Sequence, residues 1–162
     1  MKLLRTGQRQ IQFELAPSEK ALLFHLLQLY PLVPSAHHRL SKGRKMPDRE
    51  ENQRLLEESL QARRQENRQQ VDAMLNETGR FVERPAGYQV SFTRGEIEWL
   101  LQVLNDVRVG SWIALGSTAE HPEMEPEMSK QTMSHVMTMD IAAFFEMGFL
   151  SAVSGEFQPG HE

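Results

Sequence analysis

The sequence predicts a mainly helical fold with a small antiparallel β-sheet, an α+β class, built as a single domain over residues 1–162. Three observations favour this class. Four segments have the apolar spacing of helices, three short segments have the character of strands, and one strand-to-helix pattern occurs twice. With 162 residues, of which 40% are hydrophobic and 25% charged, the chain is long enough to bury one core.

The first predicted elements are a β-hairpin and a helix. Residues 11–15 alternate apolar and polar side chains, and residues 3–5 precede them across a short turn that contains a glycine. Pro17 suits the first turn of a helix, and Glu19 is favourable near its positive end. The apolar spacing then continues to Pro31, where the helix should end.

A long charged helix is predicted over residues 48–78. Asp48 and Glu51 resemble a capping pair, and Gly79 suits the position after the last turn. A helix of this length would span about 45 Å. It carries only six clearly apolar residues, and its middle, 61–70, is almost wholly polar. We therefore expect this middle to lie in water or against a second copy of the chain.

The most informative segment is 93–116, which has the pattern of one helix with apolar residues on nearly every side. Thr93 and Glu96 form a capping box at its start, and Gly116 ends it. A strand over 88–92 leads into it. Because a helix that is apolar on most sides lies between other elements, this one should occupy the centre of the fold.

A last helix is predicted over residues 129–154, after a loop at 117–128 that holds two prolines among glutamates. Methionines gather in this region, and methionine fills irregular cores and adaptable binding grooves alike. We expect core filling, with a partner groove as the alternative. The methionines concerned are Met124, Met128, Met133, Met137, Met139 and Met147.

An internal repeat suggests two related halves, 1–78 and 79–162. Residues 12–23 correspond in pattern to residues 89–100. Each half consists of a strand, a capped helix, a proline-bearing loop and a second helix. True pseudo-symmetry predicts that both strands lie in one sheet and lead into equivalent helices. The alternative is that any strand-to-helix junction produces this pattern.

Polar residues interrupt the apolar surface of the central helix at Asn105, Asp106 and Arg108. At 100° per residue, Asp106 and Arg108 lie roughly 160° apart and cannot pair with each other. We expect both to be mostly buried and bonded to separate partners, because an unpaired buried charge is costly. At least one partner should come from the helix 48–78. The candidates there are Arg54, Glu57, Arg63 and Arg64.

Three other interpretations of this region remain open. Arg108 and Trp112 could line a pocket for a small anionic ligand or a peptide, or Arg108 and Asp106 could form the centre of an enzyme. Alternatively, the methylene groups of Arg108 could lie along apolar surface while its guanidinium stays in water, an arrangement that requires no binding site.

The composition excludes several classes of site. The chain has no cysteine, so disulfides, thiolate catalysis and thiolate metal sites are excluded. None of the six histidines has a metal-binding spacing, and nucleophilic serine and glycine-rich phosphate motifs are absent. We therefore expect no metal, no cofactor and no catalytic residue.

Net charge and hydropathy limit the classes of partner that the chain can have. A net charge of −4 argues against a nucleic-acid binder, and the basic loop 37–45 is the one segment that favours it. No signal peptide opens the sequence, and no apolar run approaches the roughly 18 residues of a membrane span. We expect a cytoplasmic protein with no membrane partner.

The motif W-L-x-x-x-L-N-D-x-R at residues 99–108 resembles an uncharacterised bacterial family, the domain of unknown function 2017. The upstream helix of that family, of the type R-L-T-E-x-x-L, is matched at residues 54–60, with Leu56 in place of threonine. The arginine that commonly follows the family's later glycine is missing after Gly110. The resemblance covers about residues 1–150 and implies a fold but no activity. Because family members are often encoded near an adaptor of the Clp protease, it also implies a link to regulated proteolysis.

These observations favour a non-enzymatic interaction or regulatory protein that acts on an unidentified protein partner through a helical surface. We also predict a homodimer, with Arg63 and Arg64 at the interface. The alternatives are a binder of a small anionic ligand or an enzyme built around Arg108 and Asp106, and a nucleic-acid-associated regulator that uses the loop 37–45.

Overall fold

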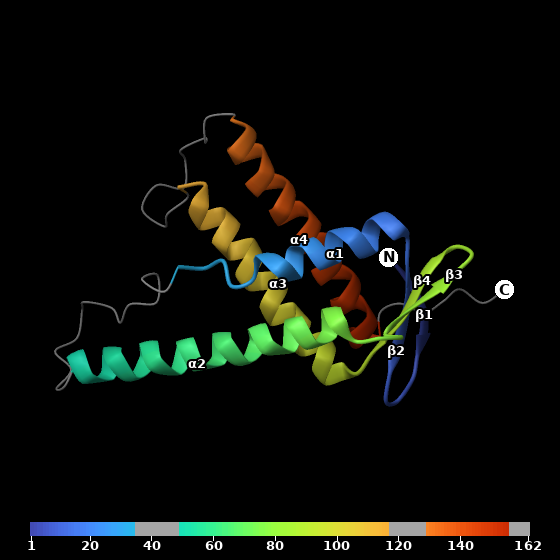
Figure 1. Cartoon of the computed structure of the whole chain (residues 1–162), viewed down its shortest axis with the longest axis horizontal. Coiled ribbons are helices and arrows are strands. Elements are labelled where there is room, and N and C mark those ends of the chain that lie inside the picture. Colours follow the sequence, from blue (N-terminus) through green and yellow to red (C-terminus); the bar gives the residue numbers. More distant parts are fainter. Residues whose placement is uncertain (35–48, 117–128, 156–162) are drawn as a thin grey trace.

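The computed structural model describes residues 1–34, 49–116 and 129–155 of the chain. Within these ranges it has four helices and four strands, and the strands form one antiparallel sheet (Figure 1). The predicted mainly helical class with a small antiparallel sheet is therefore confirmed. The elements are, in chain order, β1 (Lys2–Thr6), β2 (Ile11–Leu15), α1 (Pro17–Leu29), α2 (Arg49–Asn76), β3 (Phe81–Arg84), β4 (Gly87–Phe92), α3 (Arg94–Ala114) and α4 (Lys130–Ser154).

The sheet has the strand order β1-β2-β4-β3, and every neighbouring pair is antiparallel. β1 and β2 form the predicted hairpin, and β4 covers the predicted strand 88–92. The sequence does not predict β3, because only Phe81 among its four residues is partly buried and the apolar alternation is missing.

An approximate two-fold axis relates the two halves of the sheet. β2 and β4 are counterparts in the repeat, and they pair with each other. The repeat relates Phe13 to Val90, and these two residues form the central pair between the strands, so a two-fold rotation maps this pair onto itself. Both strands therefore lie in one sheet and lead into equivalent helices, α1 and α3, as the repeat predicts. The register pairs are Ile11–Phe92, Phe13–Val90 and Leu15–Tyr88.

The symmetry does not extend to the second helix of each half. α3 and α4 form the most extensive helix–helix contact in the described part of the chain. α2 comes close to the other helices at only a few points, and it diverges from α3 towards its N-terminal end (Figure 1). The two halves therefore share their strands and first helices, while α2 and α4 are used differently.

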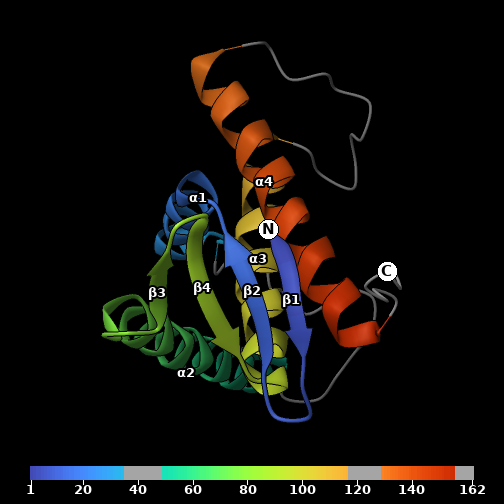
Figure 2. The same ribbon diagram turned by 90° about the vertical axis from the view of Figure 1, so that its right-hand side faces the viewer.

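The core lies on one face of the sheet, which α1, α3 and α4 cover (Figure 2). Phe149 of α4 packs edge-on against Phe13 and Phe92, with ring centroids 5.4 and 5.7 Å apart. α3 contributes buried residues along most of its length, from Ile97 to Ser111, which confirms its central position. The alternate side chains of β2 and β4 are polar and lie on the opposite face.

α2 is anchored at one end. Val71 and Met74, near its C-terminal end, are buried, whereas Leu55, near the other end, is 52% exposed. The bounds agree closely with the predicted helix. The expectation that its polar middle, 61–70, lies in water or against a second copy is wrong for Arg64, Asn67 and Arg68, because these side chains bond to the segment around Tyr30 and Val33 of the same chain. Asp48 and the basic loop 37–45 lie outside the described residues.

Core filling is the wrong interpretation for three of the methionines. Met133, Met137 and Met147 are at least half exposed, because α4 packs its opposite face inwards with small and aromatic side chains. Met139 is half-buried, and Met124 and Met128 lie outside the described residues. The inward residues of α4 are Thr138, Ala142, Phe145, Phe149 and Ala152.

Candidate functional site

Asp106 holds the chain segment that follows α1. Its Oδ1 accepts the backbone N–H groups of Leu32 at 2.7 Å and Val33 at 3.2 Å. This segment has no helix or strand to satisfy its backbone groups, so it needs acceptors from elsewhere. A carboxylate supplies charge-assisted hydrogen bonds, which are stronger than neutral ones.

Two arginines of α2 hold the same segment from the other side. Arg64 donates to the carbonyl of Val33 at 2.7 Å. Arg68 donates to the carbonyls of Gln28 at 3.0 Å and Tyr30 at 2.8 Å. Residues 28–33 are thus fixed between α2 and α3. Asp106 therefore has no direct partner on the long helix, because this segment lies between them.

Arg108 points towards α4 instead of α2. Its Nε lies 3.0 Å from Oε2 of Glu146, and its Nη2 donates to Asn105 at 2.9 Å. Asp106 and Arg108 therefore have separate partners, as predicted, but neither partner is on α2. Both residues are only half-buried, which is less than predicted: the Arg108 side chain is 42% exposed, while that of its partner Glu146 is 13% exposed.

The other predicted members of this network lie elsewhere. Arg54 and Glu57 are exposed on α2, where Arg54 approaches Glu58 at 3.8 Å and Glu57 accepts from Gln53 at 2.7 Å. Both lie in the part of α2 that diverges from α3, which removes them from Arg108. Trp112 is half-buried and does not line a pocket with Arg108 among the described pockets.

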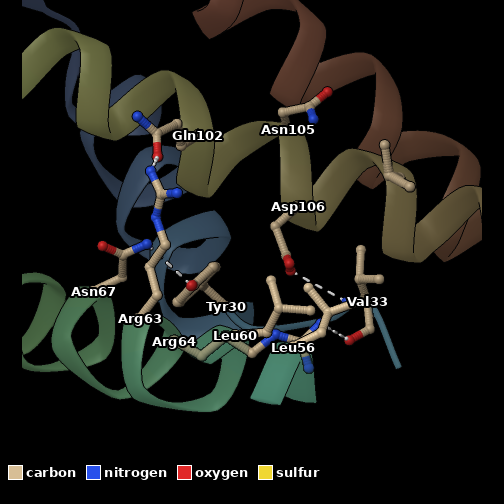
Figure 3. Close-up of a pocket in the computed structure, with 11 residues that line it drawn as sticks. Tyr30, Val33, Leu56, Leu60, Arg63, Arg64, Asn67, Gln102, Asn105 and Asp106 are labelled. Carbon is tan, nitrogen blue, oxygen red and sulfur yellow. Dashed lines mark hydrogen bonds between the residues drawn. The ribbon is translucent and has the colours of Figure 1, made fainter. Parts of the chain in front are cut away.

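A cleft of about 800 Å³ opens between α2 and α3, with the segment after α1 along one side (Figure 3). Four predicted site residues line it: Asn105, Asp106, Arg63 and Arg64. The remaining lining residues carry no site signal in the sequence and are Tyr30, Val33, Leu56, Leu60, Asn67, Gln102 and Val109.

Side-chain hydrogen bonds close one end of the cleft. Arg63 of α2 donates to Oε1 of Gln102 on α3 at 2.7 Å (Figure 3). Asn67 accepts from the indole N–H of Trp99 at 3.1 Å and donates to the hydroxyl of Tyr30 at 3.2 Å. Burial raises the pKa of Tyr30, and the Asn67 hydrogen bond partly offsets this effect.

The spacing of the buried positions along α2 could have predicted which face of this helix lines the cleft. The half-buried or buried positions from 56 to 74 recur three or four residues apart, which places them on one face. They include polar residues, so a search for apolar periodicity alone does not find them. They are Leu56, Leu60, Arg64, Asn67, Arg68, Val71 and Met74.

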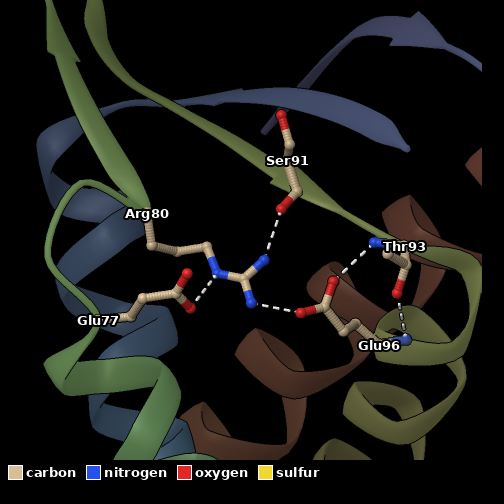
Figure 4. Close-up of polar contacts among 5 residues, drawn as sticks. All are labelled: Glu77, Arg80, Ser91, Thr93 and Glu96. Atoms are coloured by element: carbon tan, nitrogen blue, oxygen red, sulfur yellow. Dashed lines mark hydrogen bonds and ion pairs between the residues drawn. The ribbon is translucent and has the colours of Figure 1, made fainter. Parts of the chain in front are cut away.

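Arg80 forms a second polar cluster, at the junction of α2, β3 and α3 (Figure 4). It donates to Glu77 at 2.8 Å, to the carbonyl of Ser91 at 2.9 Å and to Glu96. Glu96 in turn caps α3. All these contacts are internal, so the cluster joins elements of the fold.

A third candidate surface is the outer face of α4. Six large apolar side chains on this helix are between 40% and 68% exposed. By length and composition alone α4 could cross a membrane, with a mean hydropathy of 1.5, but core helices of soluble proteins meet the same criterion. The exposed residues are Met133, Val136, Met137, Phe144, Met147 and Leu150.

Comparison with protein-family models, curated proteins and solved structures found no match to this chain. The resemblance to the domain of unknown function 2017 therefore stays a prediction. Within the described residues, no group of three or more histidine, aspartate or glutamate side chains could hold a metal ion. The candidate surfaces thus have to be judged on their own geometry.

Proposed function

We propose that this protein is a non-enzymatic interaction module that acts through the outer face of α4. The observation that carries the proposal is the set of six exposed apolar side chains on one helix. Single exposed apolar residues are ordinary, but a continuous apolar patch on a soluble protein marks an interaction surface. α4 spans about 37 Å, enough for several turns of helix–helix contact.

The spacing of these residues favours a second helix as the occupant. Four of them, Met133, Val136, Met147 and Leu150, belong with Asp140 and Ala143 to a series whose alternating steps of three and four are those that pack helices at a small crossing angle, and Met137 and Phe144 flank this series. The series is also symmetric about its midpoint, which lies between residues 141 and 142. In an antiparallel pair it sets Met133 opposite Leu150, Val136 opposite Met147, and Asp140 opposite Ala143.

This symmetry favours a second copy of the same chain. A two-fold interface requires a surface that is complementary to itself, and a largely apolar series that is symmetric along its helix meets that requirement. We therefore keep the predicted homodimer but place its interface on α4 instead of at Arg63 and Arg64. Arg63 and Arg64 already bond within the chain.

Asp140 is the charged residue within this series, and it is exposed. In the antiparallel pair it faces the small side chain of Ala143, which leaves room for hydration. The two copies of Asp140 lie close to the two-fold axis and repel each other. Asp140→Asn should therefore tighten the dimer, and the gain should shrink as salt screens the charges.

The test is sedimentation equilibrium over a concentration series. Met147→Glu should shift the chain towards monomer, because it places a charge in an apolar interface. Leu55→Glu is the matched control, since Leu55 is equally apolar and 52% exposed but lies on α2. Arg63→Glu should also leave the dimer unchanged.

Three results would overturn this proposal. Dissociation by Arg63→Glu but not by Met147→Glu would return the interface to α2. A monomer at every concentration would reject the second copy as the occupant. Cosedimentation of the wild-type chain with phosphatidylcholine vesicles, abolished by Met147→Glu, would assign the face to a lipid surface.

A further inference from the structure

The cleft between α2 and α3 is separate from the α4 face, and its lining is chemically divided. Leu56, Leu60 and Val109 supply apolar surface near its wide end. Towards the narrow end α2 presents Arg63, and α3 presents Gln102 (Figure 3). Apolar surface therefore gives way to hydrogen-bond donors within two turns of α2.

The charges of the lining are unequal. Among the described residues that line the cleft, two arginines face one aspartate, and Oδ1 of Asp106 already accepts two backbone N–H groups. The cleft is thus locally cationic in a chain whose net charge is −4. Such a local field attracts an anion and disfavours a cation.

Arg63 is the group best placed to bind that anion. Its one hydrogen bond to a described residue is to Gln102, which orients the guanidinium at the cleft wall. A guanidinium has five N–H donors in a planar fork, so several remain for a carboxylate or phosphate. Arg64 is bonded to Val33 and contributes charge to the same wall.

We propose that this cleft binds a small amphiphilic anion, a carboxylate or phosphate monoester that carries an apolar chain. The charge pairs with Arg63, and the apolar chain lies on Leu56, Leu60 and Val109. The volume of about 800 Å³ falls in the range of pockets that bind small molecules. The division between an apolar and a cationic end selects an amphiphile over a purely polar anion.

The experiment is an NMR titration of the ¹⁵N-labelled full chain with sodium octanoate, and in parallel with hexyl phosphate. The indole N–H of Trp99 reports on the cleft, because it donates to Asn67 in the cleft wall. Trp112, outside the cleft lining, serves as the internal control. The Trp99 signal should shift saturably with both probes, while the Trp112 signal should stay in place.

Substitutions in the protein and alternative ligands test how much the charge and the apolar chain of the ligand contribute to binding. Arg63→Gln should weaken octanoate binding by about tenfold or more, as expected for loss of a charge-assisted pair. Arg54→Gln, on the same helix but outside the cleft, should bind as the wild type does. Acetate should bind at least about tenfold more weakly than octanoate, because it lacks the apolar chain.

Each contrary result would overturn the proposal. No saturable shift of Trp99 would reject the site, and equal binding of octylamine would show that charge is not recognised. Unchanged affinity in Arg63→Gln would move the anion elsewhere. Binding of a glutamate-rich peptide without either anion would assign the cleft to a protein segment. The same spectra show whether Arg63→Gln folds, and none of these outcomes depends on α4.

Discussion

Glu19 and Glu96 occupy equivalent positions in the two halves and perform the same task at the start of α1 and α3. Glu19 accepts the backbone N–H of Ala16 at 2.8 Å, and Glu96 accepts that of Thr93 at 2.7 Å. Each carboxylate also binds a cation from the preceding segment, the amino group of Met1 for Glu19 and Arg80 for Glu96. The repeat thus preserves the capping carboxylate while its cation changes.

The comparison of the two caps predicts a stabilising substitution. The side-chain oxygen of Thr93 accepts the backbone N–H of Glu96 at 3.1 Å, whereas Ala16 has no hydroxyl at the equivalent position. Ala16→Ser should complete the capping box of α1 and raise the free energy of unfolding by about 1 kcal/mol. Urea unfolding measures this change. Thr93→Ala should lower the same quantity, and a loss in both variants would contradict the equivalence.

Glu96 should give the fold a measurable pH dependence. Burial raises the pKa of Glu96, but hydrogen bonds from Arg80 and Thr93 outweigh it and hold the pKa below its ordinary value of 4.5. The ionised carboxylate therefore stabilises the folded chain above pH 4.5, and this contribution is lost as the pH falls through the lowered pKa. Glu96→Gln should reduce the free energy of unfolding at pH 7 by about 1–3 kcal/mol.

The check is urea unfolding of the wild type and Glu96→Gln between pH 3 and pH 7, where the difference should shrink towards the acid end. Glu77→Gln is the matched control, because Glu77 also binds Arg80 but is 52% exposed. Its effect should be smaller at every pH. An equal loss in both variants would show that the Arg80 cluster does not depend on the Glu96 carboxylate.

Gly110 is where α3 touches the segment that follows α1. A Cβ at this position would lie 2.6 Å from the carbonyl carbon of Leu32 and 2.7 Å from its Cβ. Gly110→Ala should therefore destabilise the fold by about 1–3 kcal/mol, since backbone has to move. Gly95→Ala is the control in the same helix, where a Cβ meets nothing within 4 Å. It should be neutral or stabilise by up to about 1 kcal/mol. Equal thermal midpoints for the two variants would contradict the contact.

Local sequence signals predicted most of the fold. Alternation identified β2 and β4, and the capping box at Thr93 and Glu96 located the start of α3. These signals succeed because burial on one face and the capping of free N–H groups are decided within a few residues. β3 could not be found in this way, since an exposed edge strand is defined by its partner and not by its own side chains.

The candidate sites were less predictable, because they depend on how helices sit against each other. The angle between Asp106 and Arg108 correctly excluded a direct pair. It could not show that α4 lies beside Arg108, nor that residues 28–33 pass between Asp106 and α2. Likewise, the apolar composition of α4 was visible, but which of its faces packs inwards depends on α3 and the sheet.

Asp106 should be a major contributor to stability through the backbone that it binds. Asp106→Ala leaves the N–H groups of Leu32 and Val33 without their acceptor, which should cost about 2–3 kcal/mol. Asn105→Ala is the matched control, because Asn105 is the exposed neighbour and its bond is to Arg108. Its cost should stay below about 1 kcal/mol. Amide hydrogen exchange should also accelerate at Leu32 and Val33 in Asp106→Ala, and unchanged exchange would refute this role.

The pair between Arg108 and Glu146 should respond to pH in the opposite sense to Glu96. Burial raises the pKa of Glu146 above its ordinary value of 4.5, and the charge and hydrogen bond of Arg108 limit that rise. Its Oε1 is buried and has no hydrogen-bond partner among the described residues. The charged form thus destabilises the fold, so stability is lost as the pH rises from 4.5 through the raised pKa and is regained on acidification.

Removing Arg108 should reveal how strongly the buried charge of Glu146 destabilises the fold. Arg108→Ala leaves the Glu146 carboxylate buried without its cation, which raises its pKa further and should cost about 1–3 kcal/mol at pH 7. The cost should be smaller at pH 4.5, where more of Glu146 is protonated. Adding Glu146→Gln should restore much of the loss, since the buried charge is then gone. Urea unfolding of both variants at the two pH values measures these differences, and a loss that is independent of pH and not rescued by Glu146→Gln would show that Arg108 contributes only packing.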